Sequence, residues 1–189
     1  MDIDNFSNDE SDLEIYLDLN LIGQLCPEIQ SLSVEMAFVD FKSDKTERSS
    51  IFQKLTDLHL KGNKYRDVSV LPSLLADTPC LARLSIQVAA VIGNSGPAVL
   101  SEEMLTDLLG RNALKGLAEI TLAVVEAHHG GPQLGLGLSN LTLTSLLSHC
   151  PRLELIGDLS SWDLEDREET MEMLSTHWAW TRNIVSSTL

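Results

Sequence analysis

The apolar residues of this chain form a pattern that recurs at long intervals. In residues 117–122 the pattern is apolar-x-x-apolar-x-apolar, with Leu117, Ile120 and Leu122 at the apolar positions. Copies begin at residues 29, 55, 81, 117 and 153, at intervals of 26, 26, 36 and 36 residues. In the last copy Asp158 stands where the third apolar residue is expected. A repeat at such intervals is typical of a solenoid of stacked units rather than of a single globular core.

The spacing within each copy predicts a strand. The second and third apolar residues are two positions apart, so their side chains point to the same side of an extended chain. One such strand cannot bury its apolar side alone, whereas stacked copies form a parallel sheet with a continuous core. The chain must return between successive strands, and each intervening stretch contains a candidate helix. We therefore expect an α/β fold built on a parallel sheet.

The intervening stretches differ in how clearly they predict a helix. Helices are expected at 69–77, after Ser101, at 142–148 and at 165–177. In residues 13–25 alternating apolar residues favour a strand, whereas Asp18 is a candidate cap for a short helix, which we favour because the other copies have one. The last expected helix is the most polar, as suits an end cap. Gly62-Asn63 is a turn signal and predicts the end of the second strand.

Length and composition favour one domain with a short tail. Residues 1–12 carry five acidic residues and no basic one, so we expect an acidic disordered tail there. Residues 13–189 then form a single domain with a C-terminal capping helix. Hydrophobic residues make up 43% of the chain and aromatic residues only 5%, which suits thin layers of aliphatic side chains better than a pocket of large rings.

The net charge limits the classes of partner that the chain is expected to bind, and the apolar runs bear on its expected compartment. The net charge of −15 disfavours nucleic acid, because a phosphate-binding surface needs clustered Lys and Arg, and it equally disfavours an anionic membrane surface. No apolar run follows a basic region near the start, and no apolar stretch reaches 18 residues. We expect a cytoplasmic or nuclear protein.

The cysteines, histidines and tryptophans of the chain do not match the spacing of a known catalytic or metal-binding motif. Three widely spaced cysteines, Cys26, Cys80 and Cys150, make a poor disulfide framework, and we interpret them as small buried residues before the strands. His128-His129 lies in a glycine-rich stretch that lacks a phosphate-loop motif. The three tryptophans suit a binding platform or core packing, and these alternatives stay open. We expect no catalytic site, no metal and no cofactor, so the chain is not expected to be an enzyme.

Alternation also predicts which side chains face away from the core. If the apolar residues of each strand point inward, their neighbours line the other side of the sheet. The candidate partner-binding residues on that side are Asp57, His59, Lys61, Arg83, Ser85, Gln87, Glu119 and Thr121. Ser31, Ser33, Glu35 and Ala123 have the same parity. Two interpretations of this face stay open: a solvated face with no partner, or a face that binds a protein, which the mixed charges of Asp57, His59, Lys61 and Arg83 in an acidic chain support.

A family resemblance supports this architecture. Leu146 to Leu153, with the sequence LLSHCPRL, resembles the cysteine-containing leucine-rich repeats of F-box/LRR proteins, a ribonuclease-inhibitor-like type. The stretch 25–29 matches the same Cys-Pro motif, and Thr78-Pro79-Cys80 is a permuted version. The ending 156–162 is similar to the last repeat of insect members. The likeness covers residues 20–175.

The resemblance implies a leucine-rich-repeat solenoid, with parallel strands on the concave side and helices on the convex side. In F-box members the concave face recruits substrates to a ubiquitin ligase, so the implied role is the substrate-recognition arm of such a receptor. Residues 1–20 are too short and too acidic for an F-box, and ligase attachment is not expected from them. The alternative is a structural, partial repeat array that another chain completes, with no ligase role.

Overall fold

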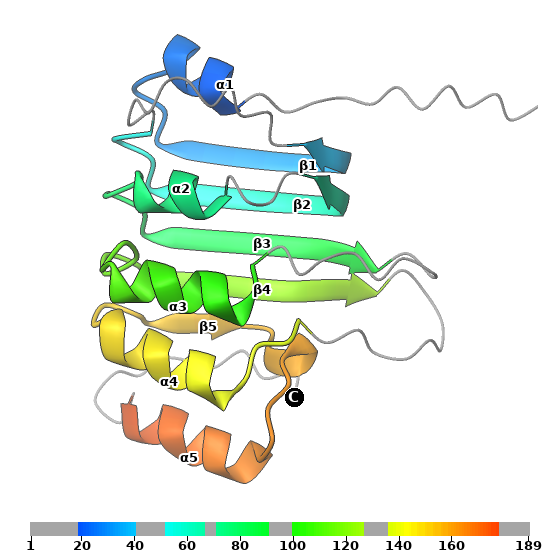
Figure 1. Ribbon diagram of the computed structural model, residues 1–189. Coiled ribbons are helices and arrows are strands. Elements are labelled where there is room, and N and C mark those ends of the chain that lie inside the picture. The colour runs from blue at the N-terminus through cyan, green and yellow to red at the C-terminus, as the bar shows by residue number, and fades with distance from the viewer. Residues whose placement is uncertain (1–18, 41–51, 67–70, 91–99, 127–135, 178–189) are drawn as a thin grey trace, which may run out of the picture.

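The described part of the protein consists of a parallel sheet with helices on one face (Figure 1). The computed structural model describes residues 19–40, 52–66, 71–90, 100–126 and 136–177. The strands are β1 (Ser31–Asp40), β2 (Asp57–Arg66), β3 (Arg83–Ala90), β4 (Glu119–Glu126) and β5 (Leu155–Gly157). The helices are α1 (Leu19–Leu25), α2 (Leu71–Ala76), α3 (Glu102–Gly110), α4 (Asn140–His149), the 3-10 helix η2 (Leu159–Ser161) and α5 (Arg167–His177). The fold is therefore α/β, as the sequence predicts.

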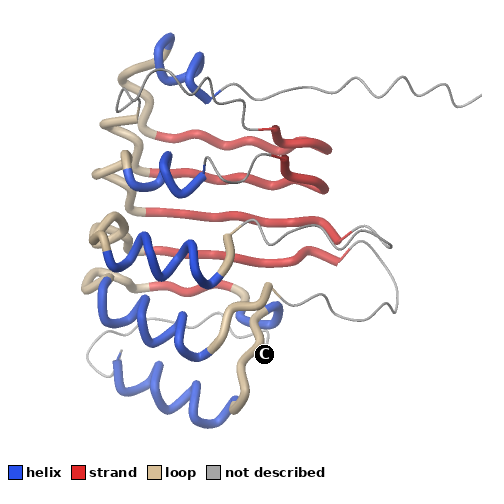
Figure 2. The backbone as a smooth tube through the Cα atoms, viewed as in Figure 1, coloured by secondary structure: helices blue, strands red, loops and turns tan. Residues whose placement is uncertain are grey.

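The five strands lie in chain order, β1-β2-β3-β4-β5, and every neighbouring pair is parallel. Helices α2, α3 and α4 lie on one face of the sheet in the same order as the strands (Figure 1). Helix α5 follows α4 at the β5 end, and α1 lies at the β1 end (Figure 2). Each return to the next strand thus adds one layer to the stack.

The apolar residues of the repeat form the core between sheet and helices. One row of paired core residues runs across all five strands: Leu32, Leu58, Leu84, Ile120 and Ile156. Ile120 is fully buried, as its place in the pattern predicts, and the helices add their own leucines to the same cluster. The turn before each strand is also regular. At residues 26, 52, 78, 114 and 150 a backbone carbonyl accepts from the N–H three residues later.

The helix predictions are correct in place, with shifted ends. Helix α3 begins after Ser101, whose hydroxyl accepts from the Met104 N–H (3.2 Å), as an N-cap should. Of the ambiguous stretch 13–25, residues 19–25 are helical, and 13–18 lie outside the described residues. The expected tail, 1–12, also lies outside them. Helix α4 begins at Asn140, two residues before the predicted start, because Ser139 caps it.

Two sequence predictions are wrong. Gly62-Asn63 does not end the second strand, which continues to Arg66. Gly62 pairs with β1 and β3 on its two sides, and these ladders override the local turn preference. Cys26 and Cys80 are exposed, so only Cys150 is the buried residue expected of all three. In the permuted motif the buried place before the strand goes to Thr78, which is 1% exposed.

At its C-terminal end the sheet has a short strand followed by a 3-10 helix. Strand β5 has three residues, and Asp158, at φ 45°, turns the chain into η2 by accepting from the Ser160 N–H. The Ser161 hydroxyl then accepts from the Val124 N–H (2.9 Å), and the Trp162 indole donates to the Leu122 carbonyl (3.0 Å). Beyond the end of β5, the backbone groups of β4 are thus hydrogen-bonded to Ser161 of η2 and to Trp162.

Candidate interaction surface

The side chains between the apolar positions of the strands form a second face of the sheet, which we call the polar face. Its residues are Ser31, Ser33, Glu35, Asp57, His59, Lys61, Arg83, Ser85, Gln87, Glu119 and Thr121. Strand pairing arranges them in rows, so that Ser33, His59, Ser85 and Thr121 are successive neighbours. All are exposed or half-buried. The structure therefore brings together all eight sequence-predicted residues on one surface.

Ion pairs cross this face from strand to strand. The Lys61 ammonium binds Glu35, and the Arg83 guanidinium binds Asp57. Each pair joins residues 26 positions apart, the repeat interval itself. The sequence predicts that these residues share a face, but their pairing was not predicted, although opposite charges one repeat apart are a signal for it. The cations of the polar face are therefore held in place by neighbouring carboxylates.

The electrostatics of the two pairs follow from these contacts. The hydrogen bond from Lys61 and its positive charge lower the pKa of Glu35. For Asp57 partial burial acts to raise the pKa, but hydrogen bonds from the Thr56 hydroxyl and Arg83 outweigh it, and the pKa is lowered. The same contact raises the pKa of Arg83. Both pairs stay ionised near neutral pH, so the face presents fixed charges of both signs around the half-buried His59.

The β4–β5 end of the polar face is more closely packed than the rest. Ala123 has the outward parity of the set but is 2% exposed, next to the residue that bonds to Ser161. Gly157 lies beside Thr121, and a Cβ on Gly157 would come within 2.5 Å of the Thr121 hydroxyl oxygen. Glycine thus permits the close approach of β5 to β4. The more accessible part of the face therefore lies on β1, β2 and β3.

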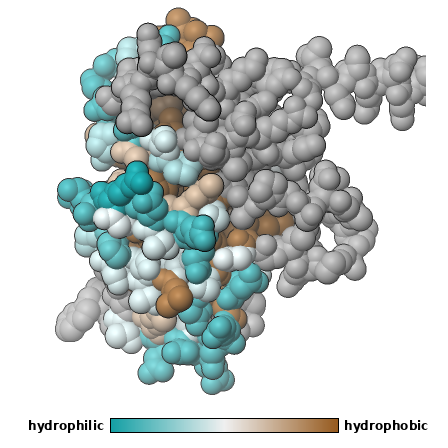
Figure 3. All heavy atoms as spheres, viewed as in Figure 1, coloured by the Kyte–Doolittle hydropathy of each residue, from teal (hydrophilic) through white to brown (hydrophobic). Residues whose placement is uncertain are grey.

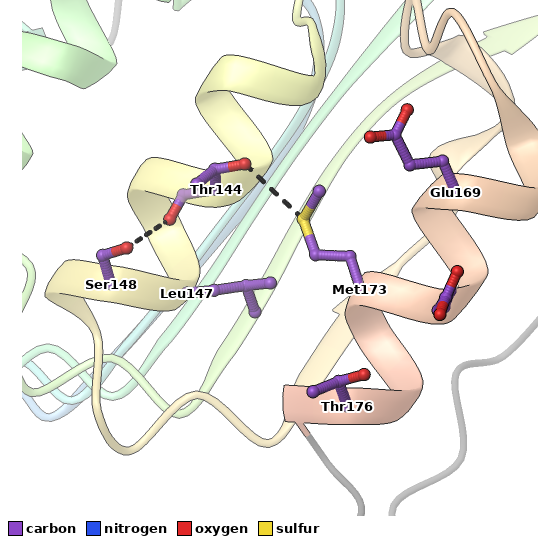
Figure 4. Close-up of a pocket in the computed structure, with 7 residues that line it drawn as sticks. Thr144, Leu147, Ser148, Glu169, Met173 and Thr176 are labelled. Carbon is purple, nitrogen blue, oxygen red and sulfur yellow. Dashed lines mark hydrogen bonds between the residues drawn. The ribbon is translucent and has the colours of Figure 1, made fainter.

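A second surface feature lies between α4 and α5. Thr144, Leu147 and Ser148 of α4 face Met173 and Thr176 of α5 across a shallow groove of about 660 Å³, with Glu169 and Glu172 on its α5 wall (Figure 4). The Thr144 hydroxyl donates to the Asn140 carbonyl (2.8 Å) and also contacts the Met173 sulfur (3.5 Å). The polar groups of the α4 wall are thus already bonded. The groove was not predicted from the sequence.

Glu102, the first residue of α3, joins α3 to α4. Its carboxylate accepts from the Ser139 N–H (2.9 Å), the Ser139 hydroxyl (2.6 Å) and the Thr142 hydroxyl (2.6 Å). These hydrogen bonds, led by the one from the Ser139 side chain, lower the pKa of Glu102. The start of α3 is thereby fixed to the start of α4.

Other candidate chemistry is limited in the described part of the chain. No group of three His, Cys, Asp or Glu residues there lies close enough to hold a metal ion. Burial raises the pKa of the Cys150 thiol to about 11, and its sulfur donates to the Leu114 carbonyl (3.3 Å). Trp162 is buried, whereas His128-His129, Trp178 and Trp180 lie outside the described residues.

Comparisons with known proteins add no relative. Searches of protein-family models, of curated proteins and of solved structures find no match to this chain. Among the described residues, every helix is too short or too polar to cross a membrane.

Proposed function

We propose that this chain is a protein-interaction module: a leucine-rich-repeat solenoid whose polar face, concave in that architecture, binds another protein. The observation that carries the proposal is the polar face itself. Successive strands present aligned rows of exposed or half-buried side chains on a rigid sheet. Stacked repeats bind partners through surfaces of this kind. The proposed role is binding, not catalysis.

The ion pairs support a surface that is prepared for binding. Lys61 and Arg83 are each held by a carboxylate on the preceding strand, so little side-chain freedom is left to lose when a partner arrives. The Asp57 side chain is 20% exposed and that of Arg83 58%, so the guanidinium remains accessible. Arg is also frequent among the residues that contribute most to protein interfaces.

The repeat geometry supports the finer proposal, a leucine-rich-repeat solenoid of the F-box/LRR type that serves as a substrate-recognition arm. The same turn hydrogen bond recurs at residues 26, 52, 78, 114 and 150, including both Cys-Pro motifs that carry the resemblance. Co-purification of the full chain, followed by identification of its partners, tests this role. Recovery of ubiquitin-ligase components supports it, and reproducible recovery of unrelated partners alone contradicts it.

Substitution of the polar face tests the binding surface. The triple variant His59→Ala, Lys61→Ala and Arg83→Ala should keep the fold, because exposed ion pairs contribute little to stability. It should weaken the partner identified by co-purification by roughly 2 kcal/mol, about 30-fold in Kd. Isothermal titration with that partner measures the change.

The matched control is a triple alanine variant of Glu168, Glu169 and Glu172 on α5, which also removes the acidic wall of the groove. It should leave the affinity within about threefold of the wild-type value. Loss of binding in the α5 variant, with binding retained in the polar-face variant, would move the interface to the α4–α5 groove.

A further inference from the structure

The junction between successive strands repeats one hydrogen-bond arrangement. The carbonyl just before a strand accepts from two consecutive N–H groups at the next strand: that of the residue before the strand and that of the strand's first residue. The four such carbonyls belong to Gln30, Thr56, Ala82 and Ala118, with N···O distances of 2.7–3.1 Å. For example, the N–H groups of Ala82 and Arg83 both donate to the Thr56 carbonyl (2.8 and 2.9 Å). Each strand is thus placed by the carbonyl of the strand before it.

The first strand lacks that carbonyl within the described residues. The N–H groups of Gln30 and Ser31, which correspond to those of Ala82 and Arg83, have no acceptor there. Strand β1 is ten residues long and, in the described sheet, pairs on one side only. A long strand edge with free N–H and C=O groups is a template for another strand.

Packing is also incomplete at this end. Ile29 and Leu32 are half-buried, whereas Leu55 and Leu58, their counterparts one repeat later, are 0% and 1% exposed. Leu25 of α1 is 71% exposed, and Figure 3 shows apolar atoms at the surface at the α1 end of the molecule. Among the described residues, both the hydrogen bonds and the core therefore stop one repeat short of the arrangement seen in the middle of the sheet.

We propose that this N-terminal edge binds a parallel β-strand from another polypeptide, whose backbone carbonyl accepts from the N–H groups of Gln30 and Ser31. The strand is parallel because the two N–H groups that have no acceptor among the described residues lie together at the start of β1, where every internal junction of this sheet has its carbonyl. Its apolar residues follow the spacing apolar-x-x-apolar-x-apolar and cover Ile29 and Leu32. A Lys or Arg fits beside Glu35, since opposite charges pair across neighbouring strands here.

The C-terminal edge of a second copy does not suit this place. Strand β5 has only three residues, against ten in β1, and Asp158 ends it by turning the chain into η2. Helix α5 then follows at the same end of the stack (Figure 1). Head-to-tail pairing of two copies would leave most of β1 uncovered. A different polypeptide with a longer strand matches the edge better.

A peptide with a strand sequence of the chain itself is a suitable probe. Residues 53–64, QKLTDLHLKGNK, carry the required apolar spacing and place Lys61 in the row of Glu35. The labelled peptide is titrated with the full chain by fluorescence anisotropy, and the amides it affects are located by NMR. We expect saturable binding with shifts of the Gln30, Ser31 and Ser33 amides. The same peptide with Leu58→Asp and Leu60→Asp should not bind.

A pair of substitutions at one edge position makes the test specific. Alternation of backbone groups along a strand directs the Ser33 N–H to the outer edge, as it does that of Ser31. Ser33→Pro removes this donor without disturbing the β1–β2 ladder, whereas Ser33→Ala keeps it. The proline variant should bind the peptide at least tenfold more weakly, and the alanine variant should bind like the wild type.

Each of the following results would overturn the proposal. They are absence of saturable binding, equal affinity of the proline and alanine variants, shifts confined to the polar face or to α4 and α5, and protection of the Gln30 and Ser31 amides in the monomer without peptide. The last would show that the chain itself fills the edge. Protection that appears only as the protein concentration rises would assign the edge to a second copy and would equally contradict the proposal.

Discussion

Cys26 and Cys150 occupy the same position in two repeats, and their surroundings differ completely. Each accepts, through its carbonyl, from the N–H three residues later, and each donates its own N–H to the carbonyl four residues earlier. The distances agree closely, at 3.0 and 2.8 Å for Cys26 and 3.0 and 2.9 Å for Cys150. Yet Cys26 is exposed, whereas Cys150 is fully buried.

The difference lies in the preceding repeat. The Cys150 sulfur donates to the Leu114 carbonyl, which stands at the same position one repeat earlier. Among the described residues Cys26 has no repeat before it. The local sequence therefore sets the backbone of the turn, but burial of its side chain depends on the layer that packs against it.

The largest expected effect is on the free energy of unfolding, and it compares two residues of the same core row, one in β4 and one in β1. Ile120→Asp should destabilise the protein by about 4 kcal/mol, because it buries a carboxylate among aliphatic side chains. Leu32→Asp lies in the same row but at the half-buried edge, so its cost should be about 1–2 kcal/mol. Urea denaturation of both variants measures the difference, and equal losses would mean that β1 is as well covered as β4.

Thiol chemistry gives the second contrast. Cys26 should react with a thiol reagent at pH 8 at least about 100-fold faster than Cys150, because the thiolate is the reactive form. Burial both excludes the reagent from Cys150 and raises the pKa of its thiol to about 11. Peptide mass spectrometry after timed alkylation separates the sites. Similar rates at Cys26 and Cys150 would show that the two turns are equally exposed in solution.

A smaller effect concerns how layers are joined near the C-terminal end. Glu102→Ala should cost about 1–3 kcal/mol, because it leaves the buried Thr142 hydroxyl and the Ser139 donors without their acceptor. The folded state lowers the pKa of Glu102, so its contribution is present above the unfolded pKa and is lost as the pH falls through the folded pKa.

The pH dependence supplies the control for this variant. The difference in unfolding free energy between the wild type and Glu102→Ala should be constant near neutral pH and shrink as the pH falls below about 4. Denaturation at several pH values measures it. A difference that stays constant down to pH 2 would show that the carboxylate charge is not what joins α3 to α4.

Repeat spacing allowed the strands and the inward side chains to be predicted, because a period of two in each copy leaves only one parity for the core. The polar face follows from the same parity. The ends of the stack could not be predicted in this way. The local sequence does not distinguish Cys26 from Cys150. Gly62 lies in a strand because it pairs with β1 and β3, and a local turn signal carries no information about such pairing. The α4–α5 groove depends on how α4 and α5 pack against each other, which the repeat spacing does not specify.

Amide hydrogen exchange at the strand junctions tests most directly the claim that the stack is complete in its middle and open at β1. In the monomeric protein the Gln30 and Ser31 amides should exchange at nearly unprotected rates. The corresponding amides of Ala82, Arg83, Ala118 and Glu119, each bonded to a carbonyl of the preceding repeat, should exchange at least about 100-fold more slowly. Equal protection at all three junctions would contradict the account, because it would mean that the first strand already has a neighbour on its outer side.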